Sequence, residues 1–163
     1  MIVPSEFEVY QRLIEFLGAN GWTIICASPP GGTDNRYRKC LLPRREIGGS
    51  EKGPRDEVDV TALNKDVIVL IECKPRLSDS LTQLNALLES DYRKLKRIES
   101  SFYPSRLSSL LQRTTEVSIP ENPTIALALA VGSVNCDPPS DMAVLEFASK
   151  DPRIWRSGSL KFC

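Results

Sequence analysis

The feature that most constrains the fold is one stretch, Glu57 to Pro75, which reads EVDVTALNKDVIVLIECKP. Its first part, Glu57 to Leu63, alternates apolar and polar residues with a period of two, which predicts a β-strand. Its second part, Val67 to Cys73, is an unbroken apolar run rich in β-branched residues, as in strands buried on both faces of a sheet. Because Asn64 to Asp66 are turn residues, the stretch predicts two neighbouring strands joined by a short turn.

Charged residues close the apolar run, although burying an unpaired charge is costly. Glu72 and Lys74 fall on one face of the predicted strand and Cys73 on the other, because successive strand residues alternate. If the two strands form a hairpin, Asp59 lies roughly opposite Glu72. We therefore expect two carboxylates and one lysine at the same edge of the sheet.

This predicted cluster has the composition of a magnesium site. Two adjacent carboxylates repel each other, and a divalent cation removes the repulsion; Mg²⁺ commonly takes one or two carboxylates and keeps several waters. We expect Asp59 and Glu72 as metal ligands, the backbone carbonyl of Cys73 as a further ligand, and Mn²⁺ as a substitute ion. Lys74 could polarise the attacking water or stabilise charge on a phosphoryl oxygen.

The order of these residues resembles the PD-(D/E)xK nuclease superfamily, which has the restriction-endonuclease-like fold. The resemblance covers about Glu57 to Pro75, where Asp59 precedes an apolar strand that ends in Glu72-Cys73-Lys74. It implies that Asp59 and Glu72 bind Mg²⁺ and that Lys74 assists phosphodiester hydrolysis. The residue before Asp59 is valine, where the family pattern has proline. The alternative is that Glu72 and Lys74 only face water at a strand end, because short motifs also occur by chance.

Composition places the chain among ordinary globular proteins. It has 163 residues, 41% hydrophobic and 26% charged, which fits one domain spanning residues 1–163. The formal net charge is +0, so a nucleic-acid enzyme of this composition needs a local basic face. No apolar run is long enough to span a membrane, and Met1 to Gln11 lacks the features of a signal peptide, which predicts a cytoplasmic protein.

The numbers of histidine and cysteine residues limit which catalytic mechanisms and metal sites are possible. The chain has no histidine, which excludes Ser-His-Asp and Cys-His catalysis built within it, histidine zinc sites and any nuclease with a histidine base. Its five cysteines are scattered without a CxxC pair, so neither a zinc ribbon nor a disulfide framework is indicated. We expect mostly structural thiols in a reducing compartment. Carboxylate, metal and lysine remain for hydrolysis.

Two helices are predicted on either side of the central stretch. The first spans Glu6 to Gly18, because Ser5 and Glu8 form a capping box before an apolar stripe. In the nuclease family the first helix often carries an acidic residue near the metal, and Glu6 is the candidate here. The alternative is that Glu6 only interacts with the positive end of its helix. The second helix spans Asp79 to Ile98, with a continuous apolar stripe.

Shorter patterns complete the predicted fold. Strands are expected at Trp22–Cys26, Arg36–Leu42 and Thr124–Gly132, and a short helix around Leu107–Leu111. Ser140–Ser149 fits either a helix or a strand, and the helix is slightly favoured because Ser140 and Asp141 precede the apolar run. The resulting order predicts a three-layer-like α/β sandwich with a mixed central β-sheet, restriction-endonuclease-like in its arrangement.

Basic residues gather before the central stretch and in the second half of the second helix. They could bind phosphates, although a solvated loop and the helix dipole are alternative explanations. The candidates for nucleic-acid contacts are Arg36, Arg38, Lys39, Arg44, Arg45, Arg93, Lys94 and Arg97. Glu6, Glu57 and Gln83 are additional candidates for the site, and Glu57 could instead pair with Arg55.

The main hypothesis is a Mg²⁺-dependent nuclease that hydrolyses phosphodiester bonds of nucleic acid, foremost a DNA endonuclease. The first alternative is a catalytically inactive nucleic-acid- or protein-binding module on the same fold, against which the retained Asp59, Glu72 and Lys74 argue. A hydrolase or lyase acting on a small phosphorylated substrate is the second, and no GxxxxGK loop supports it. A nuclease of this size that cuts both strands is expected to act as a homodimer.

Overall fold

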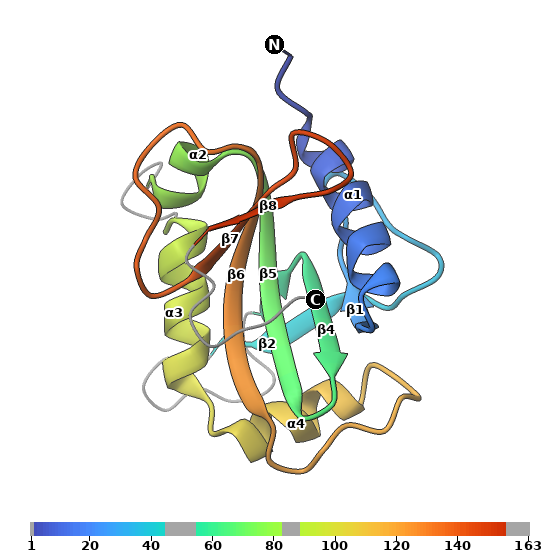
Figure 1. Ribbon diagram of the computed structural model, residues 1–163. Coiled ribbons are helices and arrows are strands. Elements are labelled where there is room, and N and C mark those ends of the chain that lie inside the picture. Colours follow the sequence, from blue (N-terminus) through green and yellow to red (C-terminus); the bar gives the residue numbers. More distant parts are fainter. Residues whose placement is uncertain (1, 45–54, 83–88, 156–163) are drawn as a thin grey trace.

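The computed structural model describes residues 2–44, 55–82 and 89–155. Its main element is a six-stranded sheet with helices on both faces (Figure 1). In spatial order the strands are β1 (Thr23–Ala27), β4 (Val60–Asn64), β5 (Val67–Arg76), β6 (Thr124–Ser133), β7 (Ala143–Glu146) and β8 (Arg153–Trp155). The pairs β1–β4, β4–β5 and β7–β8 are antiparallel, whereas β5–β6 and β6–β7 are parallel. The predicted α/β class with a mixed central sheet is confirmed.

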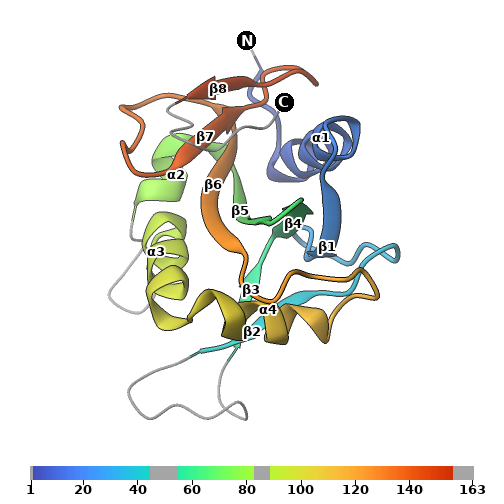
Figure 2. The same cartoon turned by 60° about the horizontal axis from the view of Figure 1, so that its bottom comes forward.

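Helix α1 (Glu6–Ala19) covers one face of the sheet, on the side opposite α2 and α3 in Figure 2. The predicted cap is present, because the side-chain oxygen of Ser5 accepts a hydrogen bond of 3.1 Å from the backbone N–H of Glu8. Leu13 and Leu17 of α1 pack with Val69 of β5 in the hydrophobic core on this face. Capping and the apolar stripe thus place the first turn of α1 at a fixed position.

The opposite face is covered by α2 (Leu77–Leu81), α3 (Asp91–Ser101) and α4 (Pro104–Gln112). The prediction of one helix from Asp79 to Ile98 is wrong, because Thr82 is extended, with φ −93° and ψ 128°. A new helix begins at Ser90, whose side-chain oxygen caps the backbone N–H of Arg93 at 3.2 Å. The described part of the apolar stripe therefore falls on two helices, with Leu81 on α2 and Leu95 and Ile98 on α3, a division that spacing alone does not reveal.

Strand β5 is buried on both faces, as predicted. Ile68 and Leu70 pack in the core beneath α3, and Val69, Ile71 and Cys73 pack in the core beneath α1. All five are inaccessible to solvent. The alternation explains the unbroken apolar run, because each face of this strand has its own layer of helices.

The predicted strand Glu57 to Leu63 is not continuous. Residues Arg55–Val58 form β3, which pairs with β2 (Cys40–Pro43) in a separate two-stranded sheet, while β4 starts at Val60. Val58 packs in the core on the α3 side and Val60 in the core on the α1 side. A regular strand would point both valines the same way, so the chain changes direction between them, at Asp59.

Two further predictions are corrected. The helix expected at Ser140–Ser149 is strand β7, whose Val144 and Leu145 are fully buried on opposite faces of the sheet. The expected strand Arg36–Leu42 is shorter, because β2 begins only at residue 40. Burial of this segment on both faces of the sheet favours a strand, although its local capping pattern favours a helix.

The cysteine prediction is wrong for one pair. Cys26 of β1 and Cys40 of β2 form a disulfide, with 5.2 Å between their Cα atoms. Both are buried, whereas of the described free cysteines Cys73 is buried and Cys136 exposed. The bond joins the main sheet to the two-stranded sheet. Among the helices of the described ranges, none has the length and apolar character needed to cross a membrane.

Candidate active site

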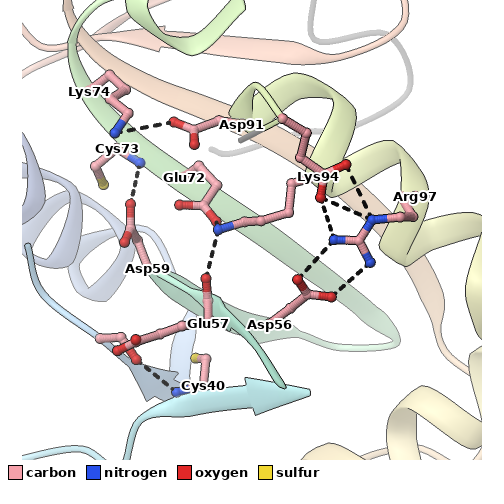
Figure 3. Close-up of polar contacts among 12 residues, drawn as sticks. Cys40, Asp56, Glu57, Asp59, Glu72, Cys73, Lys74, Asp91, Lys94 and Arg97 are labelled. Carbon is pink, nitrogen blue, oxygen red and sulfur yellow. Dashed lines mark hydrogen bonds and ion pairs between the residues drawn. The ribbon is translucent and has the colours of Figure 1, made fainter. Parts of the chain in front are cut away.

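Asp59 lies at the break between β3 and β4, and its carboxylate points toward the end of β5 (Figure 3). Its Oδ2 accepts a hydrogen bond of 2.7 Å from the backbone N–H of Cys73. The register, with Val60 opposite Ile71, places Asp59 beside Glu72, as the hairpin prediction required. N–H and C=O of one strand residue point to the same side, so the Cys73 carbonyl also faces Asp59.

Glu72 projects from β5 toward α3, and its side chain is only 4% exposed. Its Oε1 forms an ion pair with Nζ of Lys94, which also donates a hydrogen bond of 2.8 Å to the backbone carbonyl of Glu57. Burial raises the pKa of Glu72 well above its ordinary value, and the charge of Asp59 raises it further, although Lys94 opposes the shift. One ammonium group therefore does not balance the carboxylates around it.

Lys74 lies between two acidic side chains at the end of β5. Its Nζ is 3.1 Å from Oε1 of Glu6, in the first turn of α1, and 3.9 Å from Oδ2 of Asp91, in the first turn of α3. Burial by itself lowers the pKa of Lys74, but the charges of Asp91 and Glu6 outweigh it and leave the pKa raised. Lys74 is therefore protonated at neutral pH and acts as a cation and hydrogen-bond donor.

Asp91 is a member of this cluster that the sequence reasoning missed. Its side chain is 15% exposed, and within the described parts of the chain no donor forms a hydrogen bond to its buried Oδ2. Burial raises the pKa of Asp91 to about 6, while Lys74 and Lys94 oppose the shift. The sequence feature that could have indicated Asp91 is the N-cap residue Ser90, which places Asp91 in the first turn of α3. The prediction of one long helix across this region concealed that helix start.

The cluster carries an excess of negative charge. Among the described residues, four carboxylates and two ammonium groups meet here, which leaves a formal charge of −2 from Glu6, Asp59, Glu72, Asp91, Lys74 and Lys94. Within residues 2–44, 55–82 and 89–155, no three side chains of the Cys, Asp or Glu types converge closely enough to hold a metal ion on their own. A magnesium site would thus combine Asp59 and Glu72 with a backbone carbonyl and waters, which suits this ion.

Of the two additional candidates that the structure describes, Glu6 and Glu57, Glu6 contacts Lys74. The carboxylate of Glu57 instead lies 3.8 Å from Nζ of Lys39, and its closest link to the cluster is the backbone carbonyl that binds Lys94. The expected alternative partner, Arg55, lies two residues away in β3. Gln83 and Arg45 lie outside the described residues.

The basic candidates separate into two groups. Lys94 and Arg97 point inward to carboxylates, and Arg36 forms an ion pair of 2.7 Å with Asp34. Arg38 and Arg93 have exposed side chains, and Arg44, just after β2, is half-buried. The exposed members of the predicted set stay candidates for phosphate contacts, whereas Lys94 and Arg97 already have acidic partners.

Comparisons with profiles of known protein families, with curated proteins and with solved structures give no match. The features that carry a functional interpretation are therefore those of the chain itself. A carboxylate at the break before β4, a second carboxylate on β5, a protonated lysine two residues beyond the second, and acidic residues from two helix starts meet at one end of these inner strands.

Proposed function

We propose that the protein is a Mg²⁺-dependent nuclease that hydrolyses phosphodiester bonds of nucleic acid, with DNA as its substrate and internal bonds as its targets. The observation that carries the proposal is the meeting of Asp59 and Glu72 beside the Lys74 ammonium, in a cluster with more negative than positive charge. A divalent cation would offset that excess, and a phosphodiester would supply the substrate oxygens that such an ion and a lysine bind.

In this proposal Asp59, Glu72 and the backbone carbonyl of Cys73 hold the ion. When bound, Mg²⁺ would act as a Lewis acid toward the scissile phosphate. The Cys73 N–H fixes the Asp59 carboxylate through the 2.7 Å hydrogen bond, so this ligand is oriented before any ion binds. The Cys73 side chain packs in the core beneath α1, so it anchors this end of β5.

Lys74 would contact the reacting phosphate or the attacking water. Because its pKa is raised, it carries a proton at neutral pH and can stabilise negative charge that develops on a phosphoryl oxygen, but it is not a base in this state. Glu6 and Asp91 hold the ammonium from two sides and so restrict its position. Both lie in the first turns of capped helices, α1 and α3.

The fold supports the same proposal by analogy. A mixed central sheet with helices on both faces is compatible with the core expected for a PD-(D/E)xK nuclease. Fold analogy by itself does not fix an activity, so the argument rests on the site. Cutting of both strands by two copies of the chain stays a prediction.

One observation favours the alternative of a catalytically inactive binding module. The ion pair between Lys94 and Glu72 lets this buried carboxylate be accommodated without a metal ion. A module of this kind would bind nucleic acid or protein but would neither cut DNA nor bind Mg²⁺ at Asp59 and Glu72. The two functions therefore differ in a directly measurable property.

Cleavage of closed DNA circles tests the proposal. Supercoiled plasmid and circular single-stranded DNA would be incubated with the protein and Mg²⁺, Mn²⁺ or EDTA, because a circle offers no end to an exonuclease. We expect metal-dependent nicking, with a rate lower by about 10² to 10³-fold in Lys74→Met, the cost typical of losing one charge-stabilising donor. Lys150→Met, at an exposed position in a loop, is the matched control.

The outcomes are distinct. Cutting that depends on the metal ion and is lost in Lys74→Met, but kept in Lys150→Met, supports the nuclease. Wild-type protein that leaves both circles intact with either metal, while circular dichroism shows it to be folded, would support the binding module instead.

A further inference from the structure

Lys94 lies at the centre of the acidic cluster, on the turn of α3 that follows Asp91 (Figure 3). Its Nζ forms an ion pair with Oε1 of Glu72 and donates a hydrogen bond to the carbonyl of Glu57, while its side chain is 21% exposed. This lysine thus bridges β5, which carries the proposed metal ligand, and β3, which leads into Asp59.

The partner of Lys94 is a carboxylate that the proposed function assigns to the metal ion. Glu72 is almost fully buried, so its charge needs a cation close by. An ammonium group and a divalent cation on the same carboxylate repel each other strongly at such short distances in a site with little water. The two cations are therefore alternatives for Glu72.

We propose that Lys94 is a positioning residue that neutralises Glu72 in the metal-free site and competes with the divalent cation for this carboxylate. The proposal rests on the proposed function, since it takes Glu72 as a metal ligand. In the metal-free state the Lys94 ammonium holds Glu72 in place against its repulsion by Asp59. When the divalent cation binds, the ammonium moves off Glu72 and becomes available to a substrate phosphate.

The surrounding structure allows this movement without a change of fold. Lysine carries its charge on a flexible four-carbon chain, so the ammonium can swing while the backbone stays in place. Helix α3 is held independently by Arg97, which binds Asp56 and Glu89 through distances between 2.5 and 3.3 Å. Asp91, one turn before Lys94, offers a second carboxylate to the displaced ammonium.

Direct measurement of Mn²⁺ binding tests the competition. Bound and free Mn²⁺ would be counted by electron paramagnetic resonance for wild type, Lys94→Met, Lys94→Arg and Glu72→Gln, without any DNA. We expect Lys94→Met to bind Mn²⁺ about tenfold more tightly than wild type, which corresponds to about 1.4 kcal/mol. Lys94→Arg restores a cation and is expected to return the affinity to the wild-type range or below it, and Glu72→Gln is expected to bind most weakly.

The matched control is Lys96→Met, on the same helix. Lys96 contacts Asp141 and Glu99, away from Glu72, so its loss is expected to leave Mn²⁺ affinity unchanged. Unchanged or weaker binding by folded Lys94→Met, next to clear binding by wild type, would overturn the competition and leave the proposed metal site standing. Absence of binding in both wild type and Lys94→Met would overturn the metal site and the competition together.

A measurement on the wild-type protein covers the case in which Lys94→Met does not fold. Acylation of lysines by a water-soluble reagent would be followed by mass spectrometry with and without Mg²⁺. We expect the rate at Lys94 to rise with Mg²⁺, because the ammonium leaves its buried partner, while the rate at exposed Lys150 stays constant. A Lys94 rate that does not respond to Mg²⁺, at ion concentrations that support binding, would contradict the proposal.

Discussion

Two cations three residues apart on α3 both contact β3, but the carboxylates around them are satisfied to different degrees. Arg97 binds Asp56 through two hydrogen bonds of 2.8 Å and also binds Glu89, so all three nitrogens of its planar guanidinium donate to carboxylates. Lys94 contacts Glu72 in a cluster that also holds Asp59 and Asp91, and the pKa of Glu72 stays raised in spite of it. In the first arrangement every carboxylate oxygen accepts a hydrogen bond from Arg97, whereas in the second the buried Oδ2 of Asp91 accepts none from the described residues.

The comparison separates a structural ion pair from a site prepared for a ligand. A buried carboxylate whose oxygens all accept hydrogen bonds from a well-placed cation gains little from a further cation. A group of carboxylates that destabilise one another gains free energy when a cation arrives, because burial and mutual repulsion are both relieved. The difference lies in how the carboxylates are buried and hydrogen-bonded, since both sites are acidic and both contain a cation from α3.

Removing the arginine is expected to give the largest effect on stability. Arg97→Met leaves Asp56 buried, at 8% side-chain exposure, without its partner, and such losses typically cost about 3 to 5 kcal/mol. Urea denaturation followed by circular dichroism measures the change. Arg93→Met, at an exposed position on the same helix, is the control and is expected to be near neutral. If Arg97→Met lowers the free energy of unfolding by less than about 1 kcal/mol, the ion pair between Arg97 and Asp56 is not an important structural contact.

The pH dependence of stability tests the excess negative charge. The pKa of Asp91 is raised from 3.8 to about 6, so the folded protein binds this proton more tightly than the unfolded chain does. The resulting stabilisation is fully present below pH 3.8 and is lost as the pH rises through 6. It amounts to the order of 2 to 3 kcal/mol, at about 1.4 kcal/mol per pKa unit. Asp91→Asn should remove this dependence, as measured by urea denaturation at a series of pH values.

Asp141, an exposed residue before β7 that contacts α3, is expected to change stability with pH in the opposite direction. Hydrogen bonds from Tyr92 and Lys96 lower the pKa of Asp141, although its partial burial opposes them. Its contribution is present above the ordinary pKa and is lost as the pH falls. Asp141→Asn should therefore leave the loss of stability between pH 4 and 6 intact. If both variants flatten that region equally, the dependence does not come from the cluster.

Amide substitutions of Glu72, in the Lys94 cluster, and of Asp56, the partner of Arg97, are expected to give the smallest changes in stability but to distinguish the two groups best. In the metal-free protein, Glu72→Gln removes one charge from an overcharged cluster and is expected to raise stability by about 1 kcal/mol, as is common when a functional residue is replaced. Asp56→Asn should instead lower stability, because Arg97 loses its charged partner. Thermal unfolding in EDTA compares the two. Equal destabilisation by both substitutions would erase the distinction between the networks.

Parts of the candidate site could be predicted because they depend on local rules. The alternation along β5 put Glu72 and Lys74 on one face, and the hairpin register put Asp59 opposite Glu72. The Ser5 cap fixed the start of α1, which brought Glu6 to Lys74. The partners of these residues on α3 could not be found in the same way, because the helix pattern concealed the start at Ser90.

The disulfide and the corrected strands show the same limit. Cys26 and Cys40 are fourteen positions apart in the sequence, and only the pairing of β2 with β3 beside β1 brings them together. Likewise β7 is a strand because it pairs with β6 between two layers of core, a property that its local sequence does not contain.

The sequence by itself determined the buried strand, its charged end and the chemical types available for hydrolysis, since these follow from periodicity and from which residues are present. The tertiary structure alone decided that Asp91 and Lys94 join the cluster and that Arg97 does not. The physical reason is that charge balance depends on distances between segments remote in the chain, and each ion pair is settled by which side chains the packed helices and strands bring within reach.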